Sequence, residues 1–417
     1  MEKILIRNID IDRWRKTGRR VLVYGRRKVG KSFFVKNFTK WDRYFFVKRD
    51  GGIIDLGDGR EVSYEYLKDI LLRDPREKIV IDEFHRLPED FLDLLHAYGE
   101  KLNLVLITST LWLAQRIFSE DSPILGIFQR FKMELIDERD ILVGLSDMFS
   151  GRKLIEAAVY LREPWLIPMI QGEVRTEIPR IIYEEKDTVE RLVGEVFREE
   201  ERSLKKSYIA ILNAVSSGKR RSGELSSHLY SRRIIPRDDP SIIQGHLRTL
   251  VNIGLLEKLK IPNRRFDQYL HKSPVTDLYF YLDSKYGFSE LEIPLRSIEK
   301  VFQELLPRHV EQYLRNLLSK IYGMTPAKII ESGYDVDIVL LDLQRIKLVG
   351  EVKWRKDIER KELRKIEAIL SGFKGAKRIL IVPEKTSLPY TPEDIEVWDV
   401  EDILEITRSH LKAPAFV

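Results

Sequence analysis

The order of apolar and polar residues predicts different architectures along the chain. In the first 140 residues, short apolar runs typical of buried strands occupy 20–24, 43–48, 78–82, 103–107 and 131–136. Segments with apolar residues at helical spacing lie between them, at 31–39, 63–73, 88–98 and 111–118. Strands that alternate with helices favour a parallel sheet covered on both faces. We therefore predict an α/β core at 1–140, followed by a small helical region at 141–200.

Residues 201–290 follow another pattern. Helical spacing marks three segments, Tyr208–Val215, Ser222–Leu229 and Pro240–Ile253. The face of the third segment is formed by Ile243, Leu247, Leu250 and Val251. A strand then begins at Gly254, and a hairpin is predicted with its tip at Asn263, Arg264 and Arg265. Three helices followed by a hairpin predict a winged helix-turn-helix.

Residues 291–417 predict a second α/β region. A long helix is expected at Phe302–Ile321, with a break at Pro307. Two strands of a hairpin follow, the first ending by Asp342 and the second at 345–354, and then a helix at 357–370 and a strand at 378–382. The chain is thus divided into four regions, at 1–140, 141–200, 201–290 and 291–417.

Composition excludes several classes of protein. The 417 residues contain no cysteine, which rules out disulfides, thiolate metal sites and cysteine catalysis. The chain has no apolar run of about 18 residues and no signal-peptide pattern, so we expect a cytoplasmic protein without a membrane segment. The seven histidines lack zinc-site spacing. The net charge of +6 permits nucleic-acid binding without requiring it.

The first candidate site is a phosphate-binding loop. Gly25, Arg26, Arg27, Lys28, Val29, Gly30, Lys31 and Ser32 fit G-x-x-x-x-G-K-[ST], and Phe33 continues into the predicted helix. Backbone N–H groups at a helix N-terminus favour phosphate. Lys31 is expected to reach the β- and γ-phosphates, and the Ser32 hydroxyl to bind Mg²⁺. These residues predict a site for ATP with Mg²⁺.

Two carboxylates and two further residues extend this site. Asp82 and Glu83 end an apolar strand, where Asp82 would bind Mg²⁺ and Glu83 would activate water as a general base. The alternative is a solvated strand end. Ser109 is the preferred sensor of the γ-phosphate, although hydroxyls here also cap helices. Arg130 is a candidate for stabilising transition-state charge, in cis or from a neighbouring subunit, so a monomer, a dimer and a ring all stay open.

The N-terminal motifs resemble P-loop ATPases of the AAA+/STAND type and, more narrowly, the archaeal ATPase family. The matching segments are Gly25–Ser32, Ile81–Phe84, Ile107–Thr110 and Ser122–Gly126. The resemblance implies an ATPase core, a helical lid, a winged helix and a C-terminal domain of restriction-endonuclease type. One departure lies in the lid, where the family usually has Gly-Gly-x-Pro. Here Pro164 remains without the glycines, which leaves contacts from the lid to the nucleotide open.

Charge distribution suggests a DNA partner. Between residues 203 and 237 the carboxylate Glu224 stands alone among eight basic residues, Lys205, Lys206, Lys219, Arg220, Arg221, Arg232, Arg233 and Arg237. Such an excess favours phosphate binding. Gln244 and Arg248 are expected to face outward on the third helix. The alternative is a hinge or a module for a protein partner.

The last candidate site is a D…E-x-K pattern, typical of PD-(D/E)xK nuclease folds. Asp337 and Glu351 would share Mg²⁺, and Lys353, two residues after Glu351, would lie beside the attacking water. Glu311 is the candidate for a helix-borne carboxylate, with Glu304 behind it. A protein can keep a nuclease fold after it has lost nuclease activity, so a pseudo-nuclease is the alternative. The favoured function is ATP-dependent processing or binding of DNA. The alternatives are a nucleotide-dependent switch and an ATPase with a protein partner.

Overall fold

The computed structural model describes residues 5–109, 117, 124–194, 202–262 and 264–412. The chain divides into two compact units. The N-terminal unit contains Arg7–Leu135, and the C-terminal unit contains Ile136–Arg191 and the described residues from 202 onward. No described helix is both long enough and apolar enough to cross a membrane.

The N-terminal unit is built on a seven-stranded sheet with the order β4-β3-β2-β5-β6-β1-β7. Its strands are β1 Val21–Tyr24, β2 Arg43–Val47, β3 Ile53–Asp55, β4 Glu61–Val62, β5 Lys78–Asp82, β6 Asn103–Thr108 and β7 Gln129–Lys132. The five strands β2, β5, β6, β1 and β7 are parallel, whereas β3 and β4 form an antiparallel edge. Because β6 lies between β1 and β5, the loops that follow these strands meet at one edge of the sheet.

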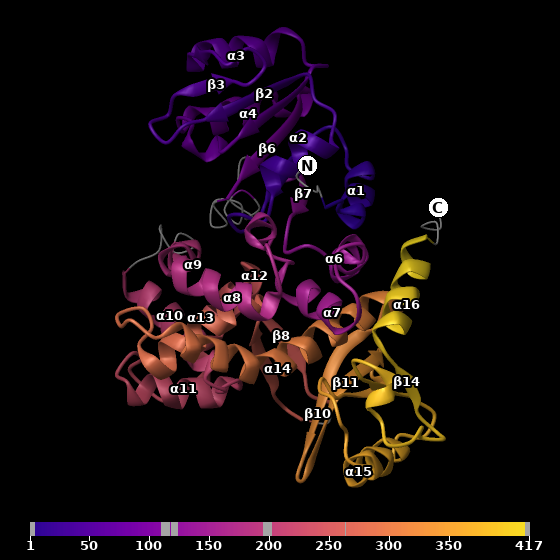
Figure 1. The fold of residues 1–417 in the computed structure, drawn as a ribbon. Coiled ribbons are helices and arrows are strands. Elements are labelled where there is room, and N and C mark those ends of the chain that lie inside the picture. The colour runs from indigo at the N-terminus through magenta and orange to yellow at the C-terminus, as the bar shows by residue number, and fades with distance from the viewer. Residues whose placement is uncertain (1–4, 110–116, 118–123, 195–201, 263, 413–417) are drawn as a thin grey trace. The chain divides into compact units, whose positions relative to one another are not determined.

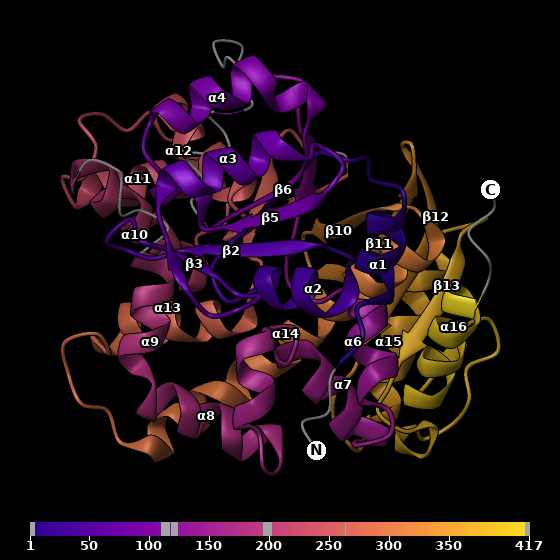
Figure 2. The same cartoon turned by 90° about the horizontal axis from the view of Figure 1, so that it is seen from above.

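Helices cover both faces of this sheet (Figures 1 and 2). The helices are α1 Asn8–Arg15, α2 Lys31–Phe38, α3 Tyr64–Arg73 and α4 Asp90–Tyr98. Leu67 of α3 and Phe91 of α4 join the apolar core on one face. On the other face Trp14 and Phe34 pack around Phe131 of β7, with ring centroids 5.1 and 5.7 Å from it. The two cores hold the α/β sandwich that the alternating pattern predicts.

Two details of the N-terminal sheet differ from the sequence prediction. The antiparallel edge strands β3 and β4 were not predicted, since they are only three and two residues long. The strand predicted at 131–136 is wrong in its bounds, because β7 pairs with β1 from Gln129 to Lys132. Beyond it, the backbone of Glu134 accepts a hydrogen bond from Arg7 instead of continuing the sheet. The predicted helix at 111–118 lies outside the described residues, apart from residue 117.

The C-terminal unit begins with helices and ends with a second sheet. Its helices are α6 Glu138–Leu145, α7 Gly151–Tyr160, α8 Val174–Glu184, α9 Lys186–Gly194, α10 Arg202–Ser216, α11 Ser222–Ser231, α12 Pro240–Asn252, α13 Pro274–Tyr286, α14 Leu295–Tyr322, α15 Arg360–Ser371 and α16 Val400–Lys412. The three segments predicted at 208–253 are present as α10, α11 and α12. The hairpin after them is β8 Leu256–Lys260 and β9 Asp267–His271. Residue 263, at the predicted tip, lies outside the described residues.

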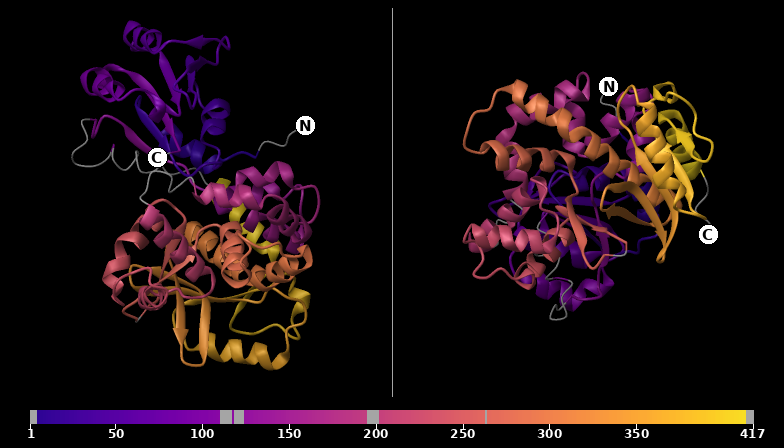
Figure 3. Two further views of the ribbon diagram at one scale, coloured as in Figure 1. Left: turned by 90° about the vertical axis from the view of Figure 1, so that its left-hand side faces the viewer. Right: turned by 90° about the horizontal axis from the view of Figure 1, so that it is seen from below.

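The second sheet also has seven strands, in the order β14-β13-β12-β11-β10-β8-β9. Its C-terminal strands are drawn in orange and yellow in Figure 3. Its other strands are β10 Thr325–Glu331, β11 Tyr334–Asp342, β12 Arg345–Val352, β13 Lys377–Ile381 and β14 Glu396–Trp398. Ala327 of β10 pairs with Lys260 of β8, so the hairpin at 256–271 belongs to the same sheet as the C-terminal strands. Arg264 strengthens this junction through an ion pair of 2.6 Å with Glu331. The sheet therefore crosses the boundary that the sequence pattern placed at residue 290.

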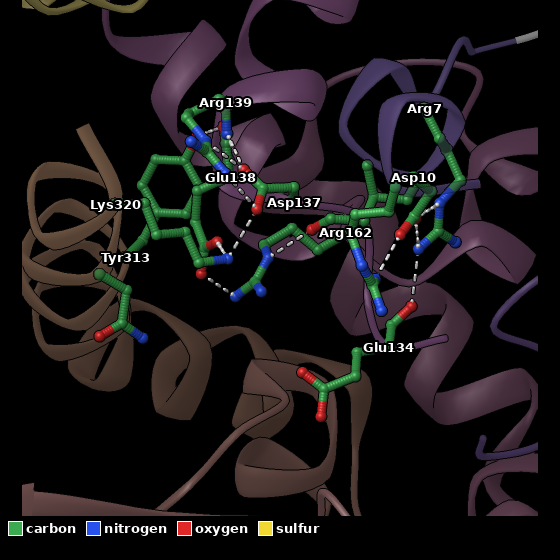
Figure 4. A network of polar contacts seen from close by, with 12 residues as sticks. Arg7, Asp10, Glu134, Asp137, Glu138, Arg139, Arg162, Tyr313 and Lys320 are labelled. Atoms are coloured by element: carbon green, nitrogen blue, oxygen red, sulfur yellow. Dashed lines mark hydrogen bonds and ion pairs between the residues drawn. The ribbon is translucent and has the colours of Figure 1, made fainter. Parts of the chain in front are cut away.

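Helix α14 runs through the C-terminal unit without the break predicted at Pro307. Buried Phe302, Leu306 and Val310 pack on both sides of the proline and hold the helix in one piece. Near its end, Lys320 contacts Glu138 and lies 2.9 Å from Asp137, in the network that Figure 4 shows. Packing and ion pairs thus fix α14 against the start of α6.

Candidate functional site

The backbone of the phosphate-binding loop takes conformations that only glycine adopts readily at two positions. Gly25 has a φ of 153°, and a Cβ there would collide with the carbonyl oxygen of Met133. Gly30 has a φ of 88° and stands immediately before Lys31, the first residue of α2. These glycines allow the loop to turn from β1 into α2, so that the N–H groups at the start of α2 line the inside of the turn.

Lys31 lies over this loop. Its Nζ donates hydrogen bonds to the carbonyl oxygens of Gly25, at 2.9 Å, and Arg26, at 2.8 Å. Burial lowers the pKa of Lys31 to about 8, while the charges of Glu83 and Asp82 oppose that change. An ammonium group with two carbonyl partners in a buried loop is available to exchange them for phosphate oxygens.

Arg7 braces the loop from behind, and sequence reasoning missed it. Its Nη1 donates to the carbonyl oxygen of Val29 at 2.7 Å, and its Nη2 donates to that of Glu134 at 2.9 Å. Asp10 fixes the guanidinium group through a bond of 2.6 Å to Nε, as Figure 4 shows. Because Arg7 lies far from the motif in sequence, the G-x-x-x-x-G-K-[ST] pattern carries no signal for it.

The two carboxylate oxygens of Asp82 differ, because one accepts a hydrogen bond within the described part of the protein and the other does not. The Tyr44 hydroxyl donates to Oδ2 at 2.8 Å, whereas buried Oδ1 has no hydrogen-bond partner among the described residues. Burial raises the pKa of Asp82, and the nearby Ser32 and Tyr44 hydroxyls oppose this shift. A buried carboxylate oxygen beside a serine hydroxyl is the hard donor set that Mg²⁺ prefers, so these residues fit the ion. Tyr44 was also missed, since one tyrosine in an apolar strand looks like a core residue.

Glu83 is held by three neighbouring side chains. Its backbone is left-handed, with a φ of 58°, which turns the chain sharply at the end of β5. The Ser109 hydroxyl donates to its two carboxylate oxygens at 2.9 and 3.1 Å. His85 Nδ1 lies 3.3 Å and Arg86 Nη2 lies 3.7 Å from Oε2. The structure thus brings Ser109 to Glu83.

The other residues predicted for this site differ in their exposure and in their distance from the phosphate-binding loop. Val29 is buried, Lys28 is exposed with a φ of 58°, and Arg26 and Arg27 are half-buried. Phe33 is 48% exposed on the first turn of α2. Arg130 is exposed on β7 and pairs with Leu22, three residues before Gly25. Three strand residues span about 10 Å, so the backbone of Arg130 lies well back from the loop.

A second group of charged residues lies in the C-terminal unit around Asp337. The backbone N–H of Val352 donates to Asp337 Oδ2 at 3.2 Å, and Lys328 Nζ donates to Oδ1 at 3.2 Å. Lys353 Nζ lies 3.0 Å from Glu351 Oε2. Burial raises the pKa of Glu351 to about 8, and the charge of Asp337 adds to this shift. The strands and α14 therefore bring together the four residues Asp337, Glu351, Lys353 and Glu311.

The helix-borne carboxylate of this group is Glu311. Burial, followed by the charge of Asp337, raises its pKa, and its Oε2 lies 3.7 Å from Lys328 Nζ. The second helix candidate, Glu304, instead accepts a hydrogen bond of 2.6 Å from Tyr281.

The carboxylates of the C-terminal group have the right chemistry for Mg²⁺, but their arrangement does not fit the ion. Lys328, which sequence reasoning missed, already bonds the Asp337 oxygen that Val352 leaves open. Among the described residues, no group of three or more His, Asp or Glu side chains is arranged to hold a metal. The two candidate sites therefore differ in whether a protein cation already bonds the key aspartate.

The basic residues predicted to face DNA are only partly free to do so. Lys205, Lys206, Arg232, Arg233 and Arg237 are exposed, as are Gln244 and Arg248 on α12. By contrast, the guanidinium of Arg221 stacks over the Phe266 ring at 4.2 Å, and Arg264 pairs with Glu331. Exposed cations therefore lie on α10, α12 and the segment after α11, whereas Arg221 and Arg264 are engaged within the protein.

Comparisons with known proteins give similarity in structure alone. No family model matches the chain, and neither does any curated protein. A Walker-type ATPase of Pyrococcus abyssi aligns with 66% of this chain and 96% of its own, at 15% identity and a TM-score of 0.47. The Orc2 protein of Aeropyrum pernix aligns with 69% of this chain and 87% of its own, at 12% identity and a TM-score of 0.37. The Orc1 protein of the same organism, solved in complex with DNA, covers 70% and 96%, at 15% and 0.28. At these similarities, function is inferred from the geometry of the sites.

Proposed function

We propose that the N-terminal unit binds ATP with Mg²⁺ and hydrolyses it. One observation carries the proposal, which is that Asp82 keeps a buried oxygen without a hydrogen-bond partner among the described residues, near the Ser32 hydroxyl. Lys31 lies close enough to Asp82 and Glu83 for their charges to oppose the lowering of its pKa. A triphosphate with a divalent cation satisfies the cationic loop and the open carboxylate together.

Each residue has a separate part in this proposal. The N–H groups of Gly25–Ser32 surround the phosphates, and Lys31 exchanges its carbonyl partners for phosphate oxygens. Ser32 and Asp82 hold Mg²⁺, which when bound neutralises charge on the phosphates. Glu83 acts as the general base toward water, and Ser109 orients its carboxylate. Arg130, exposed on β7, is proposed to act from a neighbouring subunit in an oligomer.

We propose DNA as the partner of the C-terminal unit, whose helices α10–α12 and hairpin would form a winged helix. The support is the exposed set of cations on α10, α12 and the segment after α11. Cations of this kind bind phosphates in a salt-dependent way. Since Arg264 is tied to Glu331, we place the contact on the helices instead of the hairpin.

A metal-dependent nuclease is the second candidate for the C-terminal unit. The observation that favours it is the convergence of Asp337, Glu351 and Lys353 with Glu311. Lys328 opposes it by bonding Asp337, so we assign no catalytic step to a metal there. If this unit does not cut DNA, the protein acts as a nucleotide-dependent switch, in which loss of the γ-phosphate changes affinity for DNA or a protein.

The test is a paired assay on the full chain with Mg²⁺ or Mn²⁺. ATP turnover is measured with and without duplex DNA, and cutting of a plasmid is scored in the same tubes. Lys31→Ala should abolish turnover, whereas Lys40→Ala, at an exposed lysine after α2, should not change it. Persistence of turnover in Lys31→Ala would refute the ATPase proposal.

The DNA proposal has its own control. Arg232→Ala with Arg237→Ala should weaken binding and reduce its salt dependence, by a slope of about one for each phosphate that is no longer neutralised. Arg296→Ala with Lys300→Ala removes two exposed cations from α14 and should have little effect. Equal weakening in the two double variants would contradict a specific DNA surface. Cutting that Asp337→Ala eliminates would establish the nuclease, and absence of cutting favours the switch.

A further inference from the structure

Lys328 occupies an irregular position in the second sheet. Ala327 of β10 pairs with Val339 of β11, but Ile329, two residues later, pairs with Val336. Lys328 is therefore opposed by two residues, Asp337 and Ile338, which is the pattern of a β-bulge. Bulges redirect side chains, and they are common beside functional sites. This one places a lysine directly against the aspartate of the D…E-x-K pattern.

The ammonium group of Lys328 contacts three carboxylates. Its Nζ lies 2.9 Å from Asp335 Oδ2, 3.2 Å from Asp337 Oδ1 and 3.7 Å from Glu311 Oε2. Only 15% of its side chain is exposed, so these contacts are screened less by solvent than those of a surface lysine. The side chain thus supplies positive charge at the point where three carboxylates meet.

Lys353 does not share this role. It pairs with Glu351 at 3.0 Å and lies 4.0 Å from Glu362 of α15. The lysine of the sequence motif therefore neutralises one part of the cluster, and Lys328 neutralises the part around Asp337. A divalent cation at Asp337 would lie against the Lys328 ammonium group, and the two positive charges would repel each other.

We infer that Lys328 is the resident counter-cation of this cluster, and that its ammonium group excludes a divalent cation from Asp337. The inference deepens the proposal of a metal-dependent C-terminal site and rests on it for the identity of the ligand class. Asp335, whose carboxylate is 58% exposed, also contacts the Lys328 ammonium group and so helps to hold it beside Asp337.

The experiment measures Mn²⁺ binding to the nucleotide-free full chain by electron paramagnetic resonance and calorimetry. Lys328→Met should bind Mn²⁺ at least about tenfold more tightly than wild type, a gain of about 1.4 kcal/mol. Lys347→Met, at an exposed lysine of β12, is the matched control and should behave as wild type. Adding Asp337→Asn to Lys328→Met should remove the gain, which places the ion in this cluster and not at Asp82.

Two results would overturn the inference. One is equal Mn²⁺ affinity in wild type and Lys328→Met, and the other is a gain that survives Asp337→Asn. Lys328→Gln, which keeps a hydrogen-bond donor without the charge, provides the same comparison if circular dichroism shows that the methionine variant does not fold.

DNA cutting is scored separately. Tighter Mn²⁺ binding without cutting would refute the nuclease but not the role of Lys328, whereas cutting by wild type with unchanged Mn²⁺ affinity in Lys328→Met would refute the role of Lys328 alone.

Discussion

Asp82 and Asp337 each belong to a recognisable sequence motif, and in each one carboxylate oxygen accepts a hydrogen bond from a neutral donor of the protein. The Tyr44 hydroxyl holds Asp82, and the backbone N–H of Val352 holds Asp337. Their second oxygens differ. Oδ1 of Asp82 has no hydrogen-bond partner among the described residues, whereas Oδ1 of Asp337 accepts a hydrogen bond from Lys328.

This difference shows what a motif specifies. A motif fixes which side chains meet, because strand and helix order determine which loops converge. It does not fix the total charge at the meeting point, because residues outside the motif contribute to that charge. Lys328 comes from a strand that is not part of the D…E-x-K pattern, and it adds one positive charge at the point where three carboxylates meet.

The largest effect expected is at Glu83. Glu83→Gln removes the general base and should lower ATP turnover about 100- to 1,000-fold, with ATP binding retained. Steady-state turnover and nucleotide-binding titrations measure the two quantities. Glu89→Gln changes an exposed glutamate before α4 and should leave both unchanged. If turnover in Glu83→Gln stays within a few-fold of wild type, Glu83 is not the base.

The next effect tests the comparison directly. Asp82→Asn should weaken Mg²⁺-dependent nucleotide binding about 10- to 100-fold, since the open oxygen is lost as a ligand. Asp337→Asn should leave Mn²⁺ affinity little changed in the otherwise wild-type chain, because Lys328 already bonds that aspartate. Calorimetric titrations at fixed nucleotide concentration measure both. A larger loss in Asp337→Asn than in Asp82→Asn would reverse the comparison.

A smaller effect is expected at Tyr44. Tyr44→Phe leaves buried Asp82 Oδ2 without its donor and should destabilise the protein by about 1–2 kcal/mol. Addition of ATP with Mg²⁺ should recover part of this loss, because the ion adds a partner for the same carboxylate. Denaturant unfolding with and without ligand measures the change. Unaltered stability of Tyr44→Phe would show that the hydroxyl does not support Asp82.

The smallest effect is expected at Ser109. Ser109→Ala removes two hydrogen bonds from Glu83 and should lower turnover between about twofold and tenfold, because the base is oriented less well. Ser146→Ala, on a half-buried serine after α6, is the control. Faster turnover in Ser109→Ala would mean that Ser109 restrains Glu83 instead of orienting it.

Much of the fold followed from local patterns. Four of the five parallel strands, the loop at 25–32 and the three helices at 202–252 are present where periodicity or glycine spacing indicated them, because each depends on neighbours close in sequence. The short strands β3 and β4 and the strand β10 were missed, since pairing with distant strands decides them. Side chains that reach the sites from elsewhere, Arg7, Tyr44 and Lys328, have no local signal. Their roles arise only when the strands are assembled.

The junction of β8 with β10 decides how this chain can be divided for expression. A fragment that begins at residue 291 would leave the backbone groups of β10 at an open sheet edge, which favours pairing between copies and aggregation. It would also lose the bonds of 2.8 and 2.7 Å that Gln312 makes to Glu257 and to the His271 carbonyl. A truncation that preserves this unit therefore has to start before α6, so that α6–α8, the hairpin and the C-terminal strands are produced together.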